Sequence, residues 1–547
     1  MRSSLTWSSA NLIGLFLLGA IPAFGTVYEV GPGCTYARIA DSPTHALEAG
    51  DTLKVYARAE PYREVFFVHG QGTEEAPIVV LGVADAAGNK PVIDGRDAVV
   101  GGAADFWNED RQLIKIGQYE THRADWVVID GFVLRFANSD QQFTDKSGAR
   151  RPFLANASGI RPEYADHVTI RHCEIYGNGN GVQNGAGEPQ ELLVEYCDIR
   201  DNGAGRRSAF EHNLYLAVGG PGSRAVVQFC RVGALASDGQ QLKTRVETAL
   251  IRYNWIEGGA NSQIDLVDHP DNGRANAYVY GNIIIKPERT NNGRFIHFGQ
   301  DLGNERQGTL YFFNNTCILR AGSSFGRLFE ISSAGAEVEA RYNIFYQVGT
   351  ADFSLRNGFD QLSGQFNWLS DAIRGEGLDD SLVGQDPGFV NAAGGDFRLA
   401  ASSPCVDVVG APLLPMEVER QYEKHLQGGI RPRDGALDLG AWERPQSTLV
   451  PADPALVDFY LTARPNPFNG QVTIGYDLPQ AGPVQLAVYS AMGQRVRWLV
   501  QGAGQAGRHE AAWDGRDDSG RPAASGIYLC ALVFAQQRQS RQLVLLR

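Results

Sequence analysis

One segment recurs through the middle of the chain, and its spacing restricts the possible folds more than any other feature. Each copy is a short apolar stretch that ends in Cys or Asn, at Cys173, Cys197, Cys230, Asn254, Asn282, Asn315, Asn343 and Asn367. The intervals between these ladder positions are 24, 33, 24, 28, 33, 28 and 24 residues. A basic unit of 24 residues with insertions of varying length is typical of a solenoid, in which each repeat forms one coil.

The copies alternate like β-strands. Val168-Thr-Ile-Arg-His-Cys173 and Ala249-Leu-Ile-Arg-Tyr-Asn254 have a period of two rather than the 3.6-residue period of a helix. The chain has 64 glycines among 547 residues, and these have no period of three, which excludes a collagen-like fold. We assign the glycine excess mainly to turns between strands. Residues 26–443 are therefore predicted to form an all-β solenoid.

Residues 26–443 resemble the right-handed parallel β-helix of the pectin-lyase type. Ala49-Gly-Asp-Thr-Leu-Lys-Val-Tyr56 is similar to the opening coils of such bacterial proteins, and Asp438-Leu-Gly-Ala-Trp-Glu443 is similar to their closing segment. Asn at the ladder position tolerates the left-handed backbone of a sharp turn, and its amide is expected to bond to the coils above and below. The three ladder cysteines are expected to be buried thiols, because stacked in-register side chains do not converge.

A second short strand follows each ladder position. Its inward apolar residues align, and the next residue in each copy must point outward because strand side chains alternate. Successive members of this outward column should lie about 4.8 Å apart. The column is Arg161, Gln183, Tyr215, Lys243, Asp265, His297, Glu330 and Arg356.

The outward column has two interpretations. Alternating charges could satisfy one another as a structural ladder, or the column could form one wall of a polysaccharide-binding groove. Donors concentrated on two adjacent strands favour the groove. The predicted catalytic residues are His212, Tyr215, Lys243 and Arg245. The predicted substrate-binding residues are Asn213, Gln241, Asp265 and His297, together with Arg206 and Arg207 in a neighbouring loop.

His212-Asn-Leu-Tyr215 and Leu242-Lys-Thr-Arg245 resemble a pair of strands in secreted bacterial β-helix proteins, which have Ser where this chain has Thr244. The lysine strand is also similar to that of alginate and chondroitin lyases, which implies β-elimination from a uronate with the lysine as base. Those lyases carry an Arg-His-Gly segment further along, where this chain has Gln263-Ile-Asp265. Arg245 is left as the candidate to neutralise the substrate charge.

Uronate β-elimination needs a cation for the carboxylate, a base for the C5 proton and an acid for the leaving oxygen. Lys243 serves as the base only if its pKa is lowered, for example by Arg245. Pairing with Asp265 would instead raise the pKa of Lys243 and make the lysine a cationic clamp. Tyr215 or His212 could supply the acid. The sequence leaves these assignments open.

Two other functions and a calcium site remain as alternatives. A glycoside hydrolase would use paired carboxylates, such as Asp265 with Asp268 or Glu330. A non-catalytic surface protein would only bind glycans through the same face. Asp265, Asp268 and Asp271 are hard oxygen donors on one turn, so Ca²⁺ is possible. We expect no other cofactor or metal.

The N-terminus has the order of a secretory signal peptide. A basic start at Arg2 precedes the apolar run from Leu12 to Ile21 and the small residues around Gly25. Residues 1–25 are therefore predicted to be removed, which leaves a mature chain without a membrane span. We expect a secreted or surface-displayed bacterial protein that is a monomer. The net charge of -13, from 49 basic and 62 acidic residues, argues against nucleic-acid binding.

The C-terminus is predicted to form a separate module. Residues 459–547 alternate in strands divided by Gly, Pro and Asp turns, which indicates a small antiparallel β-sandwich. They resemble the immunoglobulin-like modules related to the flagellar hook-cap protein. With Pro465-Asn-Pro-Phe-Asn469 near the start and an apolar-basic end, they are also similar to type IX secretion sorting domains. This resemblance implies secretion or cell-surface machinery as a partner. Residues 444–458 are the predicted linker.

Overall fold

A computed structural model shows an almost entirely β-stranded chain that divides into two compact units, Met1–Gln446 and Ser447–Arg547. Among the described residues, no helix is long and apolar enough to span a bilayer. The structure describes residues 25–445 and 461–545 except for 102–106, 120–121, 186, 188–190, 204–208, 289–291, 302, 304, 321–325, 350–352, 411, 433–434, 465, 467, 479–480, 491–494 and 535–536. The predicted signal peptide, apart from Gly25, and most of the predicted linker lie outside the described residues.

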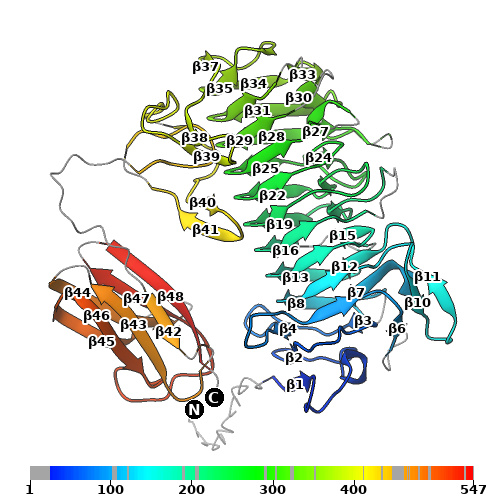
Figure 1. The fold of residues 1–547 in the computed structure, drawn as a ribbon, viewed down its shortest axis with the longest axis vertical. Helices are drawn as coiled ribbons and strands as arrows, with labels where there is room; N and C mark the ends of the chain where they lie inside the picture. Colours follow the sequence, from blue (N-terminus) through cyan, green and yellow to red (C-terminus); the bar gives the residue numbers. More distant parts are fainter. Residues whose placement is uncertain are drawn as a thin grey trace, which may run out of the picture. The chain divides into compact units, whose positions relative to one another are not determined.

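The first unit is a solenoid of three long sheets whose strands succeed one another coil by coil (Figure 1). Sheet I contains, in order, β1 (Val27–Val30), β2 (Thr52–Tyr56), β4 (Ile78–Val83), β8 (Ala124–Asp130), β13 (Ala165–Arg171), β16 (Glu191–Glu195), β19 (Arg224–Gln228), β22 (Thr248–Arg252), β25 (Ala277–Tyr280), β28 (Gly308–Phe313), β31 (Ala336–Arg341) and β34 (Leu362–Gln365). All of its strand pairs are parallel.

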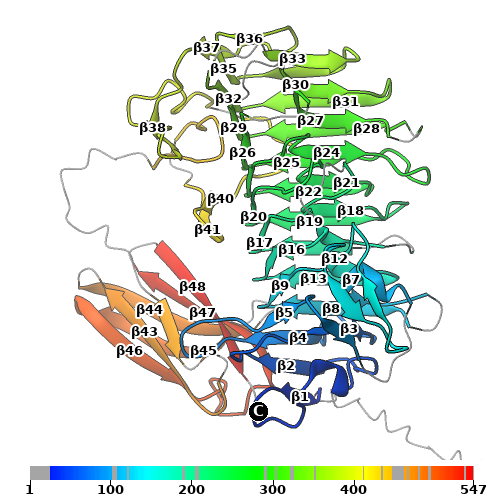
Figure 2. The same ribbon diagram turned by 45° about the vertical axis from the view of Figure 1, so that its right-hand side comes forward.

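Sheet II carries the outward column. It contains β11 (Arg150–Pro152), β10 (Gln142–Thr144), β6 (Ala98–Val100), β3 (Glu64–Val68), β7 (Gln112–Ile116), β12 (Ser158–Pro162), β15 (Asn180–Gln183), β18 (Leu214–Leu216), β21 (Leu242–Thr244), β24 (Ile264–Val267), β27 (Arg294–Gly299), β30 (Gly326–Ile331), β33 (Phe353–Gly358) and β36 (Ile373–Arg374). Figure 2 shows its strands stacked beside those of sheet I.

Sheet III closes the coil. It contains β37 (Leu382–Gly384), β35 (Trp368–Ser370), β32 (Ile344–Gln347), β29 (Thr316–Leu319), β26 (Ile283–Lys286), β23 (Trp255–Glu257), β20 (Arg231–Val232), β17 (Asp198–Arg200), β14 (Glu174–Tyr176), β9 (Val133–Arg135) and β5 (Val92–Asp94). Apolar side chains from the three sheets fill the interior as one continuous core. The predicted all-β fold, a parallel β-helix followed by a small sandwich, is confirmed.

The asparagine ladder is also confirmed, and it lies inside the solenoid. Asn282 Nδ2 donates to Asn315 Oδ1 at 3.0 Å, and Asn315 Nδ2 donates to Asn343 Oδ1 at 3.1 Å. The same oxygens accept from the backbone N–H groups of Asn282 and Asn315. All five ladder asparagines are fully buried. Nδ2 of Asn282 and of Asn315 also donates to a carbonyl of the preceding coil, so each amide bridges the coils on both sides of it.

The expected left-handed conformation belongs to a different residue. It occurs one position before the ladder residue, at His172, Tyr196, Phe229, Tyr253, Gly281, Asn314, Tyr342 and Phe366, with φ between 51° and 66°. Each non-glycine residue in this region costs about 1–3 kcal/mol, so surrounding contacts must hold it. The rings provide such contacts, because Tyr196 stacks on Phe229 at 5.0 Å and Phe229 stacks on Tyr253 at 5.3 Å between centroids.

The cysteine prediction agrees with the structure. All seven cysteines are free thiols, and Cys173, Cys197 and Cys230 are fully buried at consecutive ladder positions. Cys197 Sγ accepts from the N–H of Cys173 at 3.4 Å, as the Asn amides do in later coils. The three thiols thus continue the ladder with weaker acceptors.

Residues after the last coil fold back over the aromatic turns. Val418 joins the cluster of Phe229 and Tyr253, with Leu414 and Met416 packed against it. The N–H of Glu419 donates to Tyr253 Oη at 3.2 Å. Two short hairpins, β38 (Phe389–Asn391) with β39 (Asp396–Leu399) and β40 (Arg420–Glu423) with β41 (Gln427–Ile430), complete this closing segment.

The second unit is an antiparallel sandwich with its own core. One sheet contains β42 (Leu461–Arg464), β43 (Val472–Leu478) and β46 (Gly507–Trp513). The other contains β45 (Arg495–Gly504), β44 (Gly482–Ser490), β47 (Gly526–Phe534) and β48 (Gln537–Leu545). Trp513 and Phe468 lie at its centre with rings 5.5 Å apart.

The ladder predicts a large effect for a small substitution. Asn315→Ala removes the acceptor for the Asn282 N–H, and a buried group left unpaired costs about 1–3 kcal/mol. We expect the free energy of unfolding of the solenoid to fall by at least about 2 kcal/mol, measured by urea unfolding. Asn89→Ala in an exposed loop is the control and should change it by less than about 0.5 kcal/mol. Equal stability of the two variants would contradict a structural role for the ladder.

Candidate functional site

The strand register places the central part of the outward column on one face of sheet II. Tyr215 pairs with Lys243, Lys243 with Asp265, Asp265 with His297, and His297 with Glu330. The predicted stacking is therefore confirmed over these five coils. It is wrong at the last step, where Glu330 pairs with Asn357 and Phe329 pairs with Arg356. Leu328 and Phe329 are both buried, so alternation breaks in β30, whereas β33 alternates from Phe353 to Arg356.

Lys243 and Arg245 share one carboxylate. Lys243 Nζ lies 2.8 Å from Asp301 Oδ2, and Arg245 Nη2 pairs with the same oxygen. Arg245 is anchored from the other side, because its Nη1 donates to the Asp268 carbonyl at 2.7 Å. The Lys243 and Arg245 side chains are 13% and 8% exposed, and Asp301 is 25% exposed. Two cations are thus held against a carboxylate that reaches solvent.

The charges around Lys243 keep it protonated. Burial alone would lower its pKa, but Asp265 and Asp301 outweigh burial and raise the pKa above the usual value. Asp265 Oδ2 lies 3.4 Å from Lys243 Nζ. Of the two roles that the sequence left open, the geometry favours the cationic clamp over the general base.

Tyr215 is the residue of the column best placed for proton transfer. Arg245 Nε donates to its phenol oxygen at 3.2 Å, and Lys243 Nζ lies 5.8 Å from the ring centroid. Tyr215 is partly exposed. The phenol thus lies beside both cations and is accessible from solvent, as a group that exchanges a proton with a substrate must be.

Asp265 and His297 form a buried pair. Asp265 Oδ1 lies 2.6 Å from His297 Nδ1, and both side chains are at most 6% exposed. Burial opposes ionisation of Asp265, but the His297 hydrogen bond and the Lys243 charge outweigh it and lower the pKa of this carboxyl. His297 Nε2 continues to Ser332 Oγ at 2.7 Å. Both residues support the face rather than lie open on it, which differs from their predicted role as substrate ligands.

His212 is near the cluster but buried. It is 3% exposed, and its Nδ1 accepts the Gln240 N–H at 3.1 Å. Burial and the Lys243 charge lower the pKa of His212 to about 4. A neutral, enclosed imidazole can orient Tyr215, whose ring centroid is 5.1 Å away.

Asn213 and Gln241, which were predicted to bind substrate, point inward. Both are fully buried, and Asn213 Nδ2 donates to Gln241 Oε1 and to the Gly233 carbonyl. Each residue lies in the turn just before its strand. Side chains do not alternate strictly there, and the buried polar groups of the turn need hydrogen-bond partners inside the protein. They are structural residues of the turn. Arg206 and Arg207 lie outside the described residues.

The carboxylates proposed for calcium or hydrolysis have other partners. Asp268 Oδ1 accepts from Asn272 Nδ2 at 2.6 Å, and Glu330 pairs with Arg294 and Arg327. No group of three metal-ligating side chains occurs in the described part of the chain. The general acid of a glycoside hydrolase needs a raised pKa, whereas the pKa of Asp265 is lowered.

Sequence reasoning missed two residues, Asp301 and Ser332. Asp301 follows β27 and Ser332 follows β30, so neither belongs to the aligned strand positions. Their spacing was the available signal, because Asp301 lies four residues after His297 and Ser332 lies two residues after Glu330. Even spacing places residues on the same side of an extended strand.

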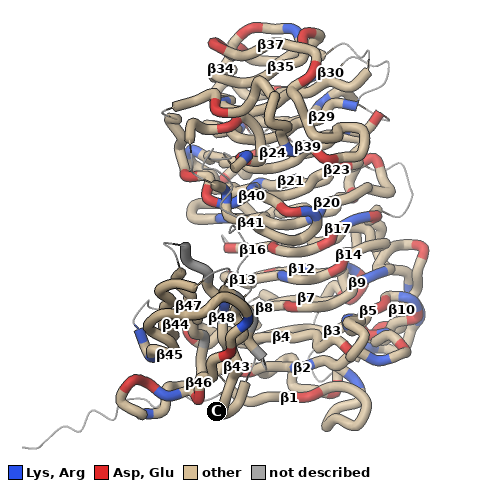
Figure 3. The backbone as a smooth tube through the Cα atoms, turned by 60° about the vertical axis from the view of Figure 1, so that its left-hand side comes forward, with Lys and Arg blue, Asp and Glu red and all other residues tan. Residues whose placement is uncertain are grey.

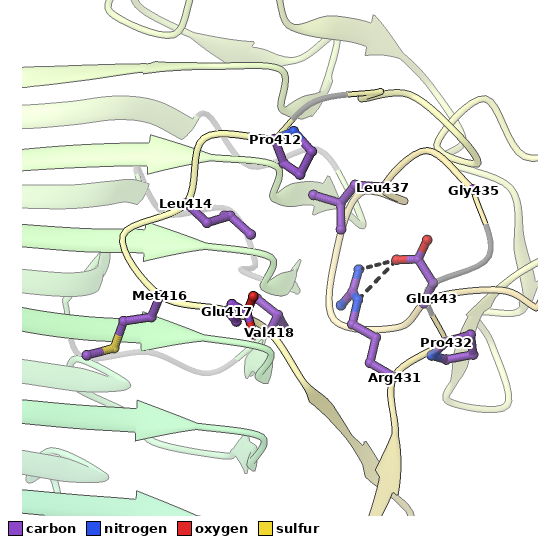
Figure 4. A pocket seen from close by; sticks show the side chains of 10 residues that line it. All are labelled: Pro412, Leu414, Met416, Glu417, Val418, Arg431, Pro432, Gly435, Leu437 and Glu443. Carbon is purple, nitrogen blue, oxygen red and sulfur yellow. Dashed lines mark hydrogen bonds and ion pairs between the residues drawn. The ribbon is translucent and has the colours of Figure 1, made fainter. Parts of the chain in front are cut away.

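A separate hollow of 430 Å³ lies in the closing segment (Figure 4). Its lining includes Leu414, Met416 and Val418, together with Arg431 and Glu443. Arg431 donates to Glu443 Oε2 through Nε and Nη2 at 3.0 and 2.8 Å, and to the Gly440 carbonyl through Nη1 at 3.2 Å. These bonds hold the closing segment together, so the charged pair is already satisfied within the fold.

The buried His212 predicts a pH effect on stability. Its folded pKa of about 4 lies below the ordinary 6.5, so the unfolded chain binds the proton more readily. Stability from this group is complete above pH 6.5 and should fall by on the order of 3 kcal/mol as the pH drops to 4. His212→Asn keeps an acceptor for the Gln240 N–H and should flatten this part of the urea stability profile. The same slope in both proteins would contradict a buried neutral His212.

The second unit matches a known domain family. A model of the FlgD Ig-like domain matches residues 465–536. No curated protein matches the chain. A pectate lyase, Pel9A, has 14% identity over 77% of this chain and 98% of its own, with a TM-score of 0.45. An alginate lyase from Paenibacillus sp. str. FPU-7 has 16% identity over 62% and 92%, with a TM-score of 0.33. The proposals below rest on the site geometry rather than on these likenesses.

Proposed function

We propose that the protein is a polysaccharide lyase that cleaves an acidic, uronate-containing polysaccharide by β-elimination on the outer face of sheet II. The observation that carries the proposal is that Lys243 and Arg245 share the Asp301 carboxylate while Arg245 also bonds to the Tyr215 phenol. Elimination needs a cationic site for a carboxylate next to a group that can move a proton. The grouping supplies both.

The carboxylate site is formed by Lys243 and Arg245. Their shared contact with Asp301 supports the idea that one carboxylate can be held by both cations at once. A uronate carboxylate would bind there beside or in place of Asp301. The two cations would then stabilise the negative charge that develops on the substrate when C5 loses its proton.

Tyr215 is the proposed proton carrier. As phenolate, its oxygen takes the C5 proton, the C5–H electrons form the C4–C5 double bond, and the C4–O4 bond breaks. The phenol then returns a proton to the departing O4 oxygen. Arg245 Nε, 3.2 Å from the phenol oxygen, holds this oxygen beside the carboxylate site. His212 has a positioning role beneath Tyr215.

The distribution of charged residues allows an anionic substrate to bind only where basic residues are concentrated locally. Basic and acidic residues are interspersed along the coils in the view of Figure 3, and the chain as a whole carries a net charge of -13. Attraction of a polyanion therefore depends on the few cations near Lys243. Binding should accordingly weaken with salt.

We also propose that the protein is exported and that its C-terminal unit contacts secretion or cell-surface machinery. The N-terminal order of charged, apolar and small residues supports export. The match of residues 465–536 to the FlgD Ig-like domain supports a separate attachment module.

Removing the phenol oxygen should abolish the reaction while preserving the fold. Tyr215→Phe should lower kcat by about 10²- to 10⁴-fold, measured by the absorbance of the new double bond during digestion of uronate polymers. Tyr278→Phe, on the outer face of sheet I, is the matched control and should retain full activity.

The products separate the candidate functions. Unsaturated ends that depend on Tyr215 support the lyase. New reducing ends without double bonds would indicate a glycoside hydrolase, and binding without cleavage would indicate a glycan-binding protein. Full elimination activity in Tyr215→Phe would remove Tyr215 from the mechanism.

A further inference from the structure

A serine, a histidine and an aspartate from successive coils form a continuous hydrogen-bonded chain. Ser332 Oγ lies 2.7 Å from His297 Nε2, and His297 Nδ1 lies 2.6 Å from Asp265 Oδ1. Asp265 belongs to β24, His297 to β27, and Ser332 follows β30. The elimination chemistry uses neither Ser332 nor the contact between Ser332 and His297.

The hydrogen bonds define the role of each group. The N–H of Gln300 donates to Ser332 Oγ at 2.7 Å, which leaves the serine hydroxyl to donate its hydrogen to His297 Nε2. Lys243 lies 3.4 Å from Asp265 Oδ2 and helps keep this carboxylate ionised. An ionised Asp265 accepts the hydrogen of His297 Nδ1, so His297 Nε2 is the nitrogen left to accept. A serine beside a base that a carboxylate orients is the arrangement that activates a nucleophile.

The backbone of Gly299 lies directly against Ser332, where only glycine fits. Gly299 has φ of +152°, and a Cβ there would collide with Ser332 Oγ. That position would lie 2.9 Å from the Ser333 nitrogen. The Ser333 N–H makes no hydrogen bond to any described residue. The N–H of the residue after a nucleophile is a common donor to the oxyanion formed in acyl transfer.

We propose that Ser332, His297 and Asp265 form a serine-hydrolase centre for carboxylic esters, such as O-acetyl groups. Ser332 lies on the same sheet as Lys243, three coils further on, which corresponds to about 14 Å. Ser332 is partly exposed, and the two residues behind it are buried, as a nucleophile and its supporting pair require. This activity is additional to the elimination and does not depend on it.

The reaction proceeds in two steps. Ser332 Oγ bonds to the ester carbonyl carbon while its proton passes to His297 Nε2, and the Ser333 N–H faces the developing oxyanion. The ester C–O bond breaks, and the departing alcohol oxygen takes the proton from His297. Water then attacks the acyl-serine, with His297 accepting its proton and returning it to Ser332. The products are a carboxylic acid and an alcohol.

The test measures ester hydrolysis and covalent labelling on the intact protein. We expect hydrolysis of p-nitrophenyl acetate, and we expect a fluorophosphonate to modify Ser332 specifically, as located by peptide mass spectrometry. Ser332→Ala should lower the hydrolysis rate by at least about 100-fold and abolish labelling. Ser354→Ala, one coil further on sheet II, is the control and should keep both.

Fluorophosphonate labelling is measured on the unaltered protein. This part of the test therefore does not depend on whether a variant folds. Modification of other serines with Ser332 untouched, or an unchanged hydrolysis rate in folded Ser332→Ala, would overturn the proposal. The absence of both hydrolysis and labelling in the unaltered protein would overturn it as well. Neither ester hydrolysis nor labelling is measured by the formation of a double bond, so the result is independent of the test of elimination.

Discussion

The stack of buried asparagine amides is the interaction on which the rest of the solenoid depends. Asn282, Asn315 and Asn343 each donate through Nδ2 to a carbonyl of the preceding coil and to the amide oxygen of the ladder asparagine in the following coil. The turn before each ladder residue is strained, because bulky residues adopt positive φ there. Internal amide bonds in the later coils, and stacked rings where the turn residue is aromatic, hold these turns in place. Insertions of different length can then be accommodated in loops without disturbing the strand register.

That constant register brings the candidate site together. Residues separated by more than 20 positions in sequence, such as Tyr215, Lys243 and Asp265, become neighbours on one face. Cations and anions on adjacent coils raise the pKa of Lys243 and lower that of Asp265, so both stay charged although largely buried. Loops that leave the ends of the strands add Asp301 and Ser332 to this rigid base.

The sequence period was sufficient to predict the coils, the interior ladder and the column from Tyr215 to Glu330, because strand alternation is a local rule. The prediction from strand alternation was wrong in the turns, where side chains do not alternate. Asn213 and Gln241 turn inward to satisfy buried polar groups, and two consecutive buried residues, Leu328 and Phe329, break the alternation of β30. Asp301 and Ser332 lie beyond strand ends, where only the folded chain shows which coil they approach.

The central claim is that the face around Lys243, Arg245 and Tyr215 breaks uronate polymers by elimination. Mass spectrometry of the oligosaccharides released from uronate polysaccharides tests it most directly. The account predicts that the new non-reducing ends are lighter by one water than those of hydrolysis products. Saturated ends of hydrolytic mass, or no cleavage of any uronate polymer by the folded protein, would contradict it.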